Sequence, residues 1–134
     1  MYTMSEAPVR GFRMKDTFLG YKRPDGSIGV RNLSLIVSTS YCAHHVAEKV
    51  ASKVSGGVAV GWYSCEEAPE KKATRTLLGL GKNPNIGSAL VIGLGCEEVR
   101  SKAVAEGIAQ SGKPVDEVVI QEVGGSTKAI EYGI

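Results

Sequence analysis

Apolar runs of strand length alternate along this chain with segments of helical periodicity, and this alternation strongly limits the folds that it can adopt. The first run is unbroken, which is typical of strands covered on both faces, as in parallel sheets. The four expected strands are 33–39, 58–63, 88–94 and 117–123. Parallel neighbours need crossover connections, and those connections are right-handed. We therefore expect an α/β fold with a three-layer, Rossmann-like parallel sheet of about four strands and repeated βα units.

The segments between these runs place apolar residues on one helical face. The three expected helices are 43–54, 69–81 and 99–112. Pro69 suits the first turn of the second helix, and Gly81 suits its end. These helices are the crossovers that a parallel sheet requires.

The chain before the first expected strand has a different pattern. Residues 1–16 show no periodicity, and we expect them to form a flexible arm. Two short β-like runs then flank Pro24-Asp25-Gly26-Ser27, a combination that favours a tight turn. We therefore expect a β-hairpin over 17–32, followed by βα units over 33–134, so that residues 17–134 form one α/β domain.

Length, charge and cysteine content exclude several classes of protein. The chain has 134 residues, and 16 basic residues nearly balance 14 acidic ones, for a net charge of +2. This balance gives no reason to expect nucleic acid as a partner. No apolar stretch is long enough to span a membrane, and the first residues lack a secretory signal. The three cysteines then indicate reduced thiols, and we expect a cytoplasmic protein.

Each of the three cysteines follows an expected strand. Because parallel strands end at the same edge of a sheet, Cys42, Cys65 and Cys96 should all lie at its carboxyl edge, where open α/β sheets bind ligands. Thiolates there could bind zinc, iron or an iron–sulfur cluster. Their spacing matches no metal motif, so small residues packed beside glycines are the alternative. A thiol redox protein is disfavoured because no CxxC pair is present.

Other residues near the same edge allow two interpretations each. Glu97, at the start of the third helix, is either a base or ligand or a charge that compensates the helix dipole. His44 is either a direct participant or a solvated side chain. The turn 124–127 is either an anion-binding nest or an ordinary strand end. The segment GLGCEE lacks the third glycine of a dinucleotide fingerprint, which argues against dinucleotide binding.

Three stretches together resemble one known family. These are FLGYKRPDGSIGVRN, NPNIGSALVIGLGCEE and IQEVGGSTKAI. They are similar to the altronate/galactarate dehydratase family, which includes the large subunit of sulfolactate sulfo-lyase, and the similarity extends over residues 17–130. The resemblance implies lyase chemistry on a small hydroxy acid. It also implies iron, as Fe²⁺ or an iron–sulfur cluster, or another divalent metal.

The resemblance also implies roles for individual residues. Cys42, Cys65 and Cys96 fall at the family's cysteine positions, and we expect them to be metal ligands. Glu97 falls at the family's LGCE string and is an expected catalytic residue. His44 is the other, not through the resemblance but because it lies in the first turn after Cys42. The residues expected to bind substrate come from the hairpin motif and the glycine pair: Arg23, Arg31, Asn32, Gly124, Gly125 and Ser126.

The resemblance further implies an incomplete site. We expect the first domain of a longer hydroxy-acid dehydratase-like lyase, whose site is completed by a remaining region or by a partner subunit. The chain by itself should fold, as a monomer or a homodimer, without turnover. The alternative is a non-catalytic α/β binding or assembly module with structural cysteines, and metal content distinguishes the two.

Overall fold

The computed structural model describes residues 17–68 and 71–134. The expected arm, 1–16, and Pro69 lie outside these residues. The strands are β1 (Tyr21–Lys22), β2 (Ile28–Gly29), β3 (Leu33–Ser38), β4 (Gly57–Gly61), β5 (Ile86–Gly93) and β6 (Val115–Val119). The helices are α1 (Tyr41–Ala51), α2 (Lys72–Lys82), α3 (Ser101–Ala109), α4 (Ile120–Val123) and α5 (Ser126–Gly133).

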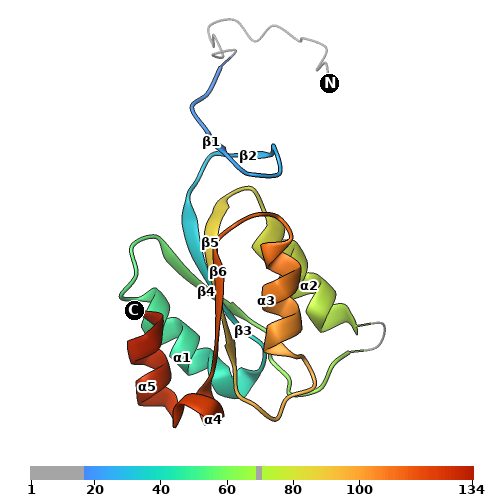
Figure 1. Cartoon of the computed structure of the whole chain (residues 1–134), viewed down its shortest axis with the longest axis vertical. Coiled ribbons are helices and arrows are strands. Elements are labelled where there is room, and N and C mark those ends of the chain that lie inside the picture. Colours follow the sequence, from blue (N-terminus) through green and yellow to red (C-terminus); the bar gives the residue numbers. More distant parts are fainter. Residues whose placement is uncertain (1–16, 69–70) are drawn as a thin grey trace, which may run out of the picture.

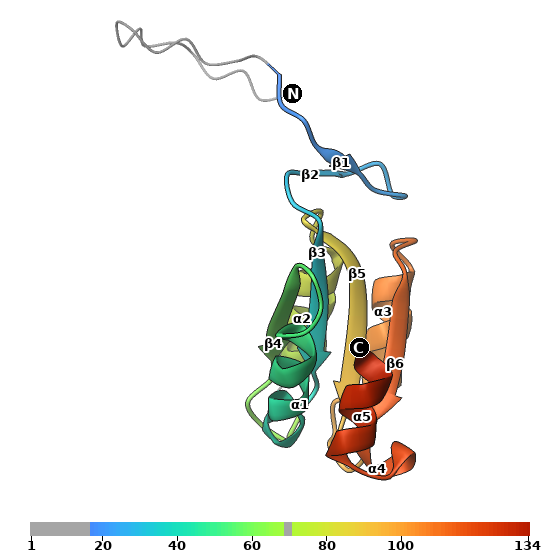
Figure 2. The same cartoon turned by 90° about the vertical axis from the view of Figure 1, so that its left-hand side faces the viewer.

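Four of the strands form one parallel sheet, as the alternating pattern predicts. Its strand order is β4-β3-β5-β6, and every neighbouring pair is parallel. Helices α1 and α5 cover one face, and α2 and α3 cover the other, so the domain has three layers (Figure 1; Figure 2). No helix in the described part of the chain is long and apolar enough to cross a membrane.

Two hydrophobic clusters lie on opposite faces of this sheet. Consecutive strand residues point to opposite sides, so Leu35 and Val37 of β3 enter one cluster while Ile36 enters the other. The first cluster lies under α2 and α3, and the second lies under α1 and α5. An unbroken apolar strand is therefore needed here, because both of its faces are buried.

The fourth expected strand is only half right, because the second half of 117–123 is helical. The last pair of the ladder is Gly93 with Val119, so β6 has no strand residue opposite it beyond that point. The Gln121 N–H instead donates to the carbonyl of Leu94 at 3.1 Å, and the chain turns into α4. Burial of Ile120 in the second cluster holds this turn against the core.

The hairpin expected before the sheet is present. Strands β1 and β2 pair antiparallel, with Tyr21 opposite Gly29. The carboxylate of Asp25 accepts hydrogen bonds from the backbone N–H and the hydroxyl of Ser27, at 2.9 and 2.6 Å. Gly26 has a φ of +86°, a conformation that glycine adopts without strain.

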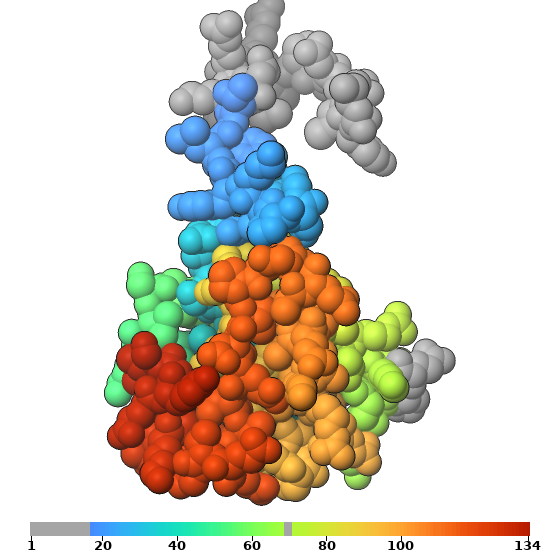
Figure 3. All heavy atoms as spheres, in the orientation of Figure 1, coloured from blue at the N-terminus to red at the C-terminus, as the bar shows by residue number. Residues whose placement is uncertain are grey.

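A buried arginine and the side chain of Asn85, which accepts from the backbone N–H groups of Val30 and Arg31, hold this hairpin against the amino edge of the sheet. Arg23 is only 8% exposed. Its guanidinium donates to the Pro84 carbonyl at 2.7 Å, to Asn32 Oδ1 at 2.7 Å and to the Arg31 carbonyl at 2.8 Å. A side chain at Gly29 would collide with the backbone of Pro84. The hairpin is thus fixed at its base, although it protrudes from the body (Figure 3).

We expect Arg23→Ala to release the hairpin without unfolding the sheet. Loss of three charge-assisted hydrogen bonds should lower the free energy of local opening by roughly 3 kcal/mol. Hydrogen exchange of the backbone amides in 20–32 should therefore accelerate by about a hundredfold. Lys22→Ala, a change at an exposed neighbour in β1, is the control. Equal acceleration in β3 and β5 would contradict a local role.

Candidate functional site

The three cysteines lie at the carboxyl edge of the sheet. Cys42 is in the first turn of α1, after β3, while Cys65 and Cys96 lie in the loops after β4 and β5. All three are exposed free thiols. We call the loops that follow β3, β4 and β5, with their cysteines, the thiol rim.

Strand order adds a reason to look for a ligand at this rim. The chain passes from β3 to β4 on one side and then to β5 on the other, so its direction of winding reverses between β3 and β5. Open α/β sheets bind ligands outside the carboxyl ends of strands at such a reversal. Cys42 and Cys96 follow the two strands that flank it.

Neighbouring thiols of the rim influence one another. The pKa of the Cys65 thiol is raised, chiefly by a hydrogen-bonding contact with Cys42, then by desolvation and by the charges of Cys42, Cys96 and Glu97. The Glu98 N–H donates to the Cys65 carbonyl at 3.0 Å and ties two of the loops together.

The thiol donors are of a type that suits zinc or iron. Among residues 17–68 and 71–134, however, no three side chains of His, Cys, Asp or Glu are assembled closely enough to hold a metal ion. The rim therefore has the donor chemistry of a metal site without its closed geometry.

Glu97 lies in the turn after β5, beside the end of β3, and is only 5% exposed. It accepts hydrogen bonds from the hydroxyl of Thr39 at 2.6 Å, from the Leu94 N–H at 2.9 Å and from the Gly95 N–H at 2.7 Å. Both carboxylate oxygens are used. This side chain closes the β5–α3 turn and joins it to the end of β3.

The hydrogen bonds also decide the ionisation of Glu97. Burial by itself would raise the pKa of this carboxyl group. The hydroxyl of Thr39 and the backbone N–H groups of the turn stabilise the charged form more strongly, so the pKa lies below its usual value. Glu97 is therefore ionised at neutral pH, and its predicted role as a base stays a prediction.

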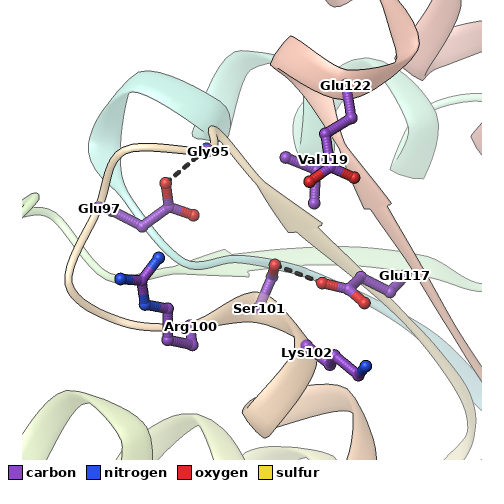
Figure 4. A pocket seen from close by; sticks show the side chains of 8 residues that line it. All are labelled: Gly95, Glu97, Arg100, Ser101, Lys102, Glu117, Val119 and Glu122. Carbon is purple, nitrogen blue, oxygen red and sulfur yellow. Dashed lines mark hydrogen bonds between the residues drawn. The ribbon is translucent and has the colours of Figure 1, made fainter.

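One cavity of about 430 Å³ opens beside Glu97, between the start of α3 and the end of β6. Figure 4 shows Arg100 and Lys102 on its α3 side, with Glu117 and Glu122 on the opposite side. The hydroxyl of Ser101 donates to Glu117 at 2.5 Å and links the two sides. Charges of both signs therefore line this cavity.

A second cavity, also of about 430 Å³, lies beside Cys42 at the start of α1. The residues that line it are Tyr41, Cys42, His44, His45, Glu48 and Tyr63. The ring of His44 is close to that of Tyr63, with 5.2 Å between centroids. His44, the other predicted catalytic residue, therefore faces a cavity that Cys42 also lines.

The predicted substrate-binding residues divide between the two edges of the sheet. Arg23, Arg31 and Asn32 lie at the amino edge, and β3, at about 3.3 Å per residue, separates them from the thiol rim. Their substrate role stays a prediction, but one chain cannot bring them to its own cysteines.

The glycine pair connects α4 with α5 at the carboxyl edge. Gly124 and Gly125 have φ values of +91° and +117°. The Gly125 N–H donates to the Ile120 carbonyl at 2.8 Å, and this hydrogen bond closes the end of α4. The hydroxyl of Ser126 lies 3.2 Å from Nε2 of His45, which ties α5 to α1. The segment 124–126 thus holds two helices together, and its role toward substrate stays a prediction.

The sequence reasoning missed three residues of this edge: Ser38, Thr39 and Gly61. Thr39 bonds Glu97, and Ser38 bonds His44. A signal was present, because the apolar strand ends in three consecutive polar residues, Ser38-Thr39-Ser40, all of which are buried. The hydroxyls of Ser38 and Thr39 have the two predicted catalytic side chains as partners, whereas Oγ of Ser40 has no partner among the described residues.

Comparisons with known proteins agree on one family. Residues 20–134 match the family model described as D-galactarate dehydratase/Altronate hydrolase, second domain. This description counts the region as the second domain, where the sequence predicts the first. The chain has no match among solved structures.

Curated relatives include enzymes of two kinds. The chain is 35% identical over 111 residues to (2R)-sulfolactate sulfo-lyase subunit beta of Chromohalobacter salexigens, covering 81% of this chain and 28% of that protein. It is 34% identical over 94 residues to altronate dehydratase of Bacillus subtilis, covering 60% and 19%. It is 32% identical over 117 residues to galactarate dehydratase (L-threo-forming) of Escherichia coli, covering 75% and 22%. The chain thus spans less than a third of each relative.

Replacing Glu97 by Gln should destabilise the domain in a manner that depends on pH. The lowered pKa means that the native carboxylate stabilises the fold above about pH 4.3, its unfolded pKa, and that this contribution disappears as pH falls through the lower folded pKa. We expect a loss of about 2 kcal/mol in the free energy of unfolding at pH 7.

The measurement is urea unfolding of both proteins at several pH values. The difference between them should shrink in acid, and Glu106→Gln, at an exposed position of α3, should show no such trend. A difference that is constant from neutral pH to strong acid would refute the ionised role of Glu97.

Proposed function

Because the chain belongs to the D-galactarate dehydratase/altronate hydrolase family, we propose that it forms part of a lyase that removes water from a small hydroxy acid. The observation that carries this proposal is the thiol rim, where three parallel strands each end beside a cysteine. The buried carboxylate of Glu97 and the ring of His44 adjoin the same rim.

We propose that Cys42, Cys65 and Cys96 hold iron, as Fe²⁺ or in an iron–sulfur cluster, or another divalent metal. A bound metal supplies Lewis acidity toward an oxygen of the substrate. The contact between the thiols of Cys65 and Cys42 supports the proposal, since two thiols that already lie together need little movement to share one cation. Closure of the ligand set then requires movement of the loops.

The two predicted catalytic residues differ in how freely they can act. Both oxygens of Glu97 are already used in hydrogen bonds within the rim, which favours a positioning role. The side chain of His44 lines a cavity, which favours contact with substrate. We therefore propose His44 as the residue that contacts the acid and Glu97 as the one that holds the rim in shape.

The rest of the site is proposed to come from regions outside this chain. The curated relatives are more than three times as long as the segment that matches, and one of them is named as a subunit. Arg31 and Asn32 lie at the edge opposite the cysteines, so we propose that they serve a neighbouring domain or subunit. The hairpin that carries them exposes apolar side chains suited to such a contact: Phe18, Leu19, Tyr21, Ile28 and Val30.

A sulfo-lyase is the second candidate, in which sulfite rather than water leaves a hydroxy acid. The similarity to the sulfo-lyase subunit favours it, because that match covers 81% of this chain at 35% identity. A non-catalytic module with structural cysteines is the third. It has the same fold but no use for metal.

Metal binding separates the enzyme from the non-catalytic module. After anaerobic incubation with ferrous iron and desalting, the chain should retain stoichiometric iron. Cys42→Ser, Cys65→Ser and Cys96→Ser should each lose most of it, because a hydroxyl is a poor substitute for a soft thiolate ligand. Ser64→Ala, a change beside Cys65 that removes no thiol, is the control. Equal iron content in all five proteins, or none in the native chain, would defeat the metal proposal.

We expect the chain by itself to show no turnover of galactarate, altronate or sulfolactate, even with iron bound. Its rim is open to solvent, and a lyase site must exclude water around a charged intermediate. The measurement is an anaerobic assay with each acid as substrate. Turnover at a few events per minute, far below ordinary enzymatic rates of about 10 s⁻¹, would already show that the chain is catalytically complete.

A further inference from the structure

The ring of His44 lies between a buried hydroxyl and the second cavity. Its Nδ1 is 2.9 Å from Oγ of Ser38, the last residue of β3, which is fully buried. The His44 side chain is 14% exposed. One ring nitrogen therefore faces the protein interior, and the other remains available to the cavity.

The environment of Ser38 determines which nitrogen of the neutral ring carries hydrogen. A serine hydroxyl has one hydrogen to donate. Within the described residues, this buried hydroxyl has one hydrogen-bond partner, Nδ1 of His44. A buried hydroxyl hydrogen without an acceptor is costly, so Ser38 donates to Nδ1. The neutral ring then carries its hydrogen on Nε2.

Gly61 makes this arrangement sterically feasible. It pairs with Ser38 across β3 and β4. A Cβ at this position would collide with Ser38 Oγ and would stand 2.7 Å from His44 Nδ1. The absence of a side chain at Gly61 therefore provides the space in which the hydroxyl and the ring meet.

The cavity presents a donor and an acceptor side by side. Nε2 of His44 lies 3.8 Å from Oε1 of Glu48, which is beyond hydrogen-bonding distance. Glu48 is 64% exposed and can adjust. A hydroxyl group fits this pair, because its oxygen accepts from Nε2–H while its hydrogen goes to the carboxylate. A carboxylate ligand does not fit, because Glu48 would repel it.

Two aromatic rings line the same cavity. The ring centroids of Tyr41 and Tyr63 are 6.0 Å apart, and both side chains are exposed. Their faces offer apolar contact to the carbon chain of a polyhydroxylated compound. The cavity volume of about 430 Å³ is ample for such a molecule.

We propose that this cavity binds an alcohol group of a polyhydroxylated ligand through Nε2–H of His44 and the carboxylate of Glu48. Ser38 is the positioning residue that fixes the tautomer of His44, with Gly61 providing the room. The proposal rests on the proposed function only in identifying this ligand as the hydroxy acid. It assigns the hydroxyl, rather than the carboxylate, of that acid to the second cavity.

The first test reads the tautomer directly. Nitrogen-15 NMR of the chain in alkaline buffer, where an imidazole is neutral, distinguishes a protonated from an unprotonated ring nitrogen. We expect hydrogen on Nε2 of His44 in the native chain, and loss of that preference in Ser38→Ala and Gly61→Ala. Ser88→Ala and Gly79→Ala are the matched controls, since neither position touches His44. Hydrogen on Nδ1 in the native chain would overturn the proposal even if no variant folds.

The second test compares three ligands by chemical-shift changes at His44 and Tyr63. Galactarate carries both hydroxyls and carboxylates, galactitol carries the hydroxyls alone, and adipate carries the carboxylates alone. We expect galactarate and galactitol to bind and adipate not to, with binding at least tenfold weaker in His44→Gln. Lys49→Gln, at an exposed position of α1 that does not line the cavity, is the control.

The outcomes separate this proposal from the proposed function. Equal binding of adipate would overturn it. The absence of any chemical-shift change with galactarate and galactitol up to about 50 mM would also overturn it, because this range detects binding free energies of only ~2 kcal/mol. In another outcome, galactitol and galactarate bind but the longer family protein dehydrates no hydroxy acid. That outcome would support the binding site and reject the proposed lyase function.

Discussion

The carboxylate of Glu97 is the interaction on which the shape of the thiol rim depends. It joins the hydroxyl of Thr39, just beyond β3, to the backbone of the turn that follows β5. This one side chain thereby links the two loops that leave the central strands at their carboxyl ends. The positions of Cys96 and of the start of α3 follow from the turn that it closes. A charged group is stable there because each of its oxygens has a donor.

Much of the fold could be predicted from local pattern, because the physics that sets it is local. An unbroken apolar strand such as β3 requires cover on two faces, and the helical stripes supply that cover. Strand order could not be predicted, since several orders satisfy the same pattern. The helical end of 117–123 escaped prediction because the ladder stops at Gly93, a limit set by the neighbouring strand.

The candidate site also has a part that the sequence could predict and a part that it could not. The common edge of the three cysteines follows from parallel strands, so sequence sufficed to predict it. One partner of each charged residue, Thr39 for Glu97 and Pro84 for Arg23, lies about sixty residues away in the chain, and no local signal indicates contacts at such a separation. Both are charged groups that were predicted to meet substrate. In the structure both neutralise the cost of their burial with backbone and side-chain partners.

The hairpin and the thiol rim lie at opposite ends of one rigid sheet, and this arrangement has a consequence for divergence within the family. Arg23 and Gly29 attach the hairpin through Pro84 and its neighbours, none of which touches the rim. Each end can therefore accumulate substitutions without disturbing the other. Relatives can therefore keep one hairpin at the amino edge while the loops at the carboxyl edge are selected separately.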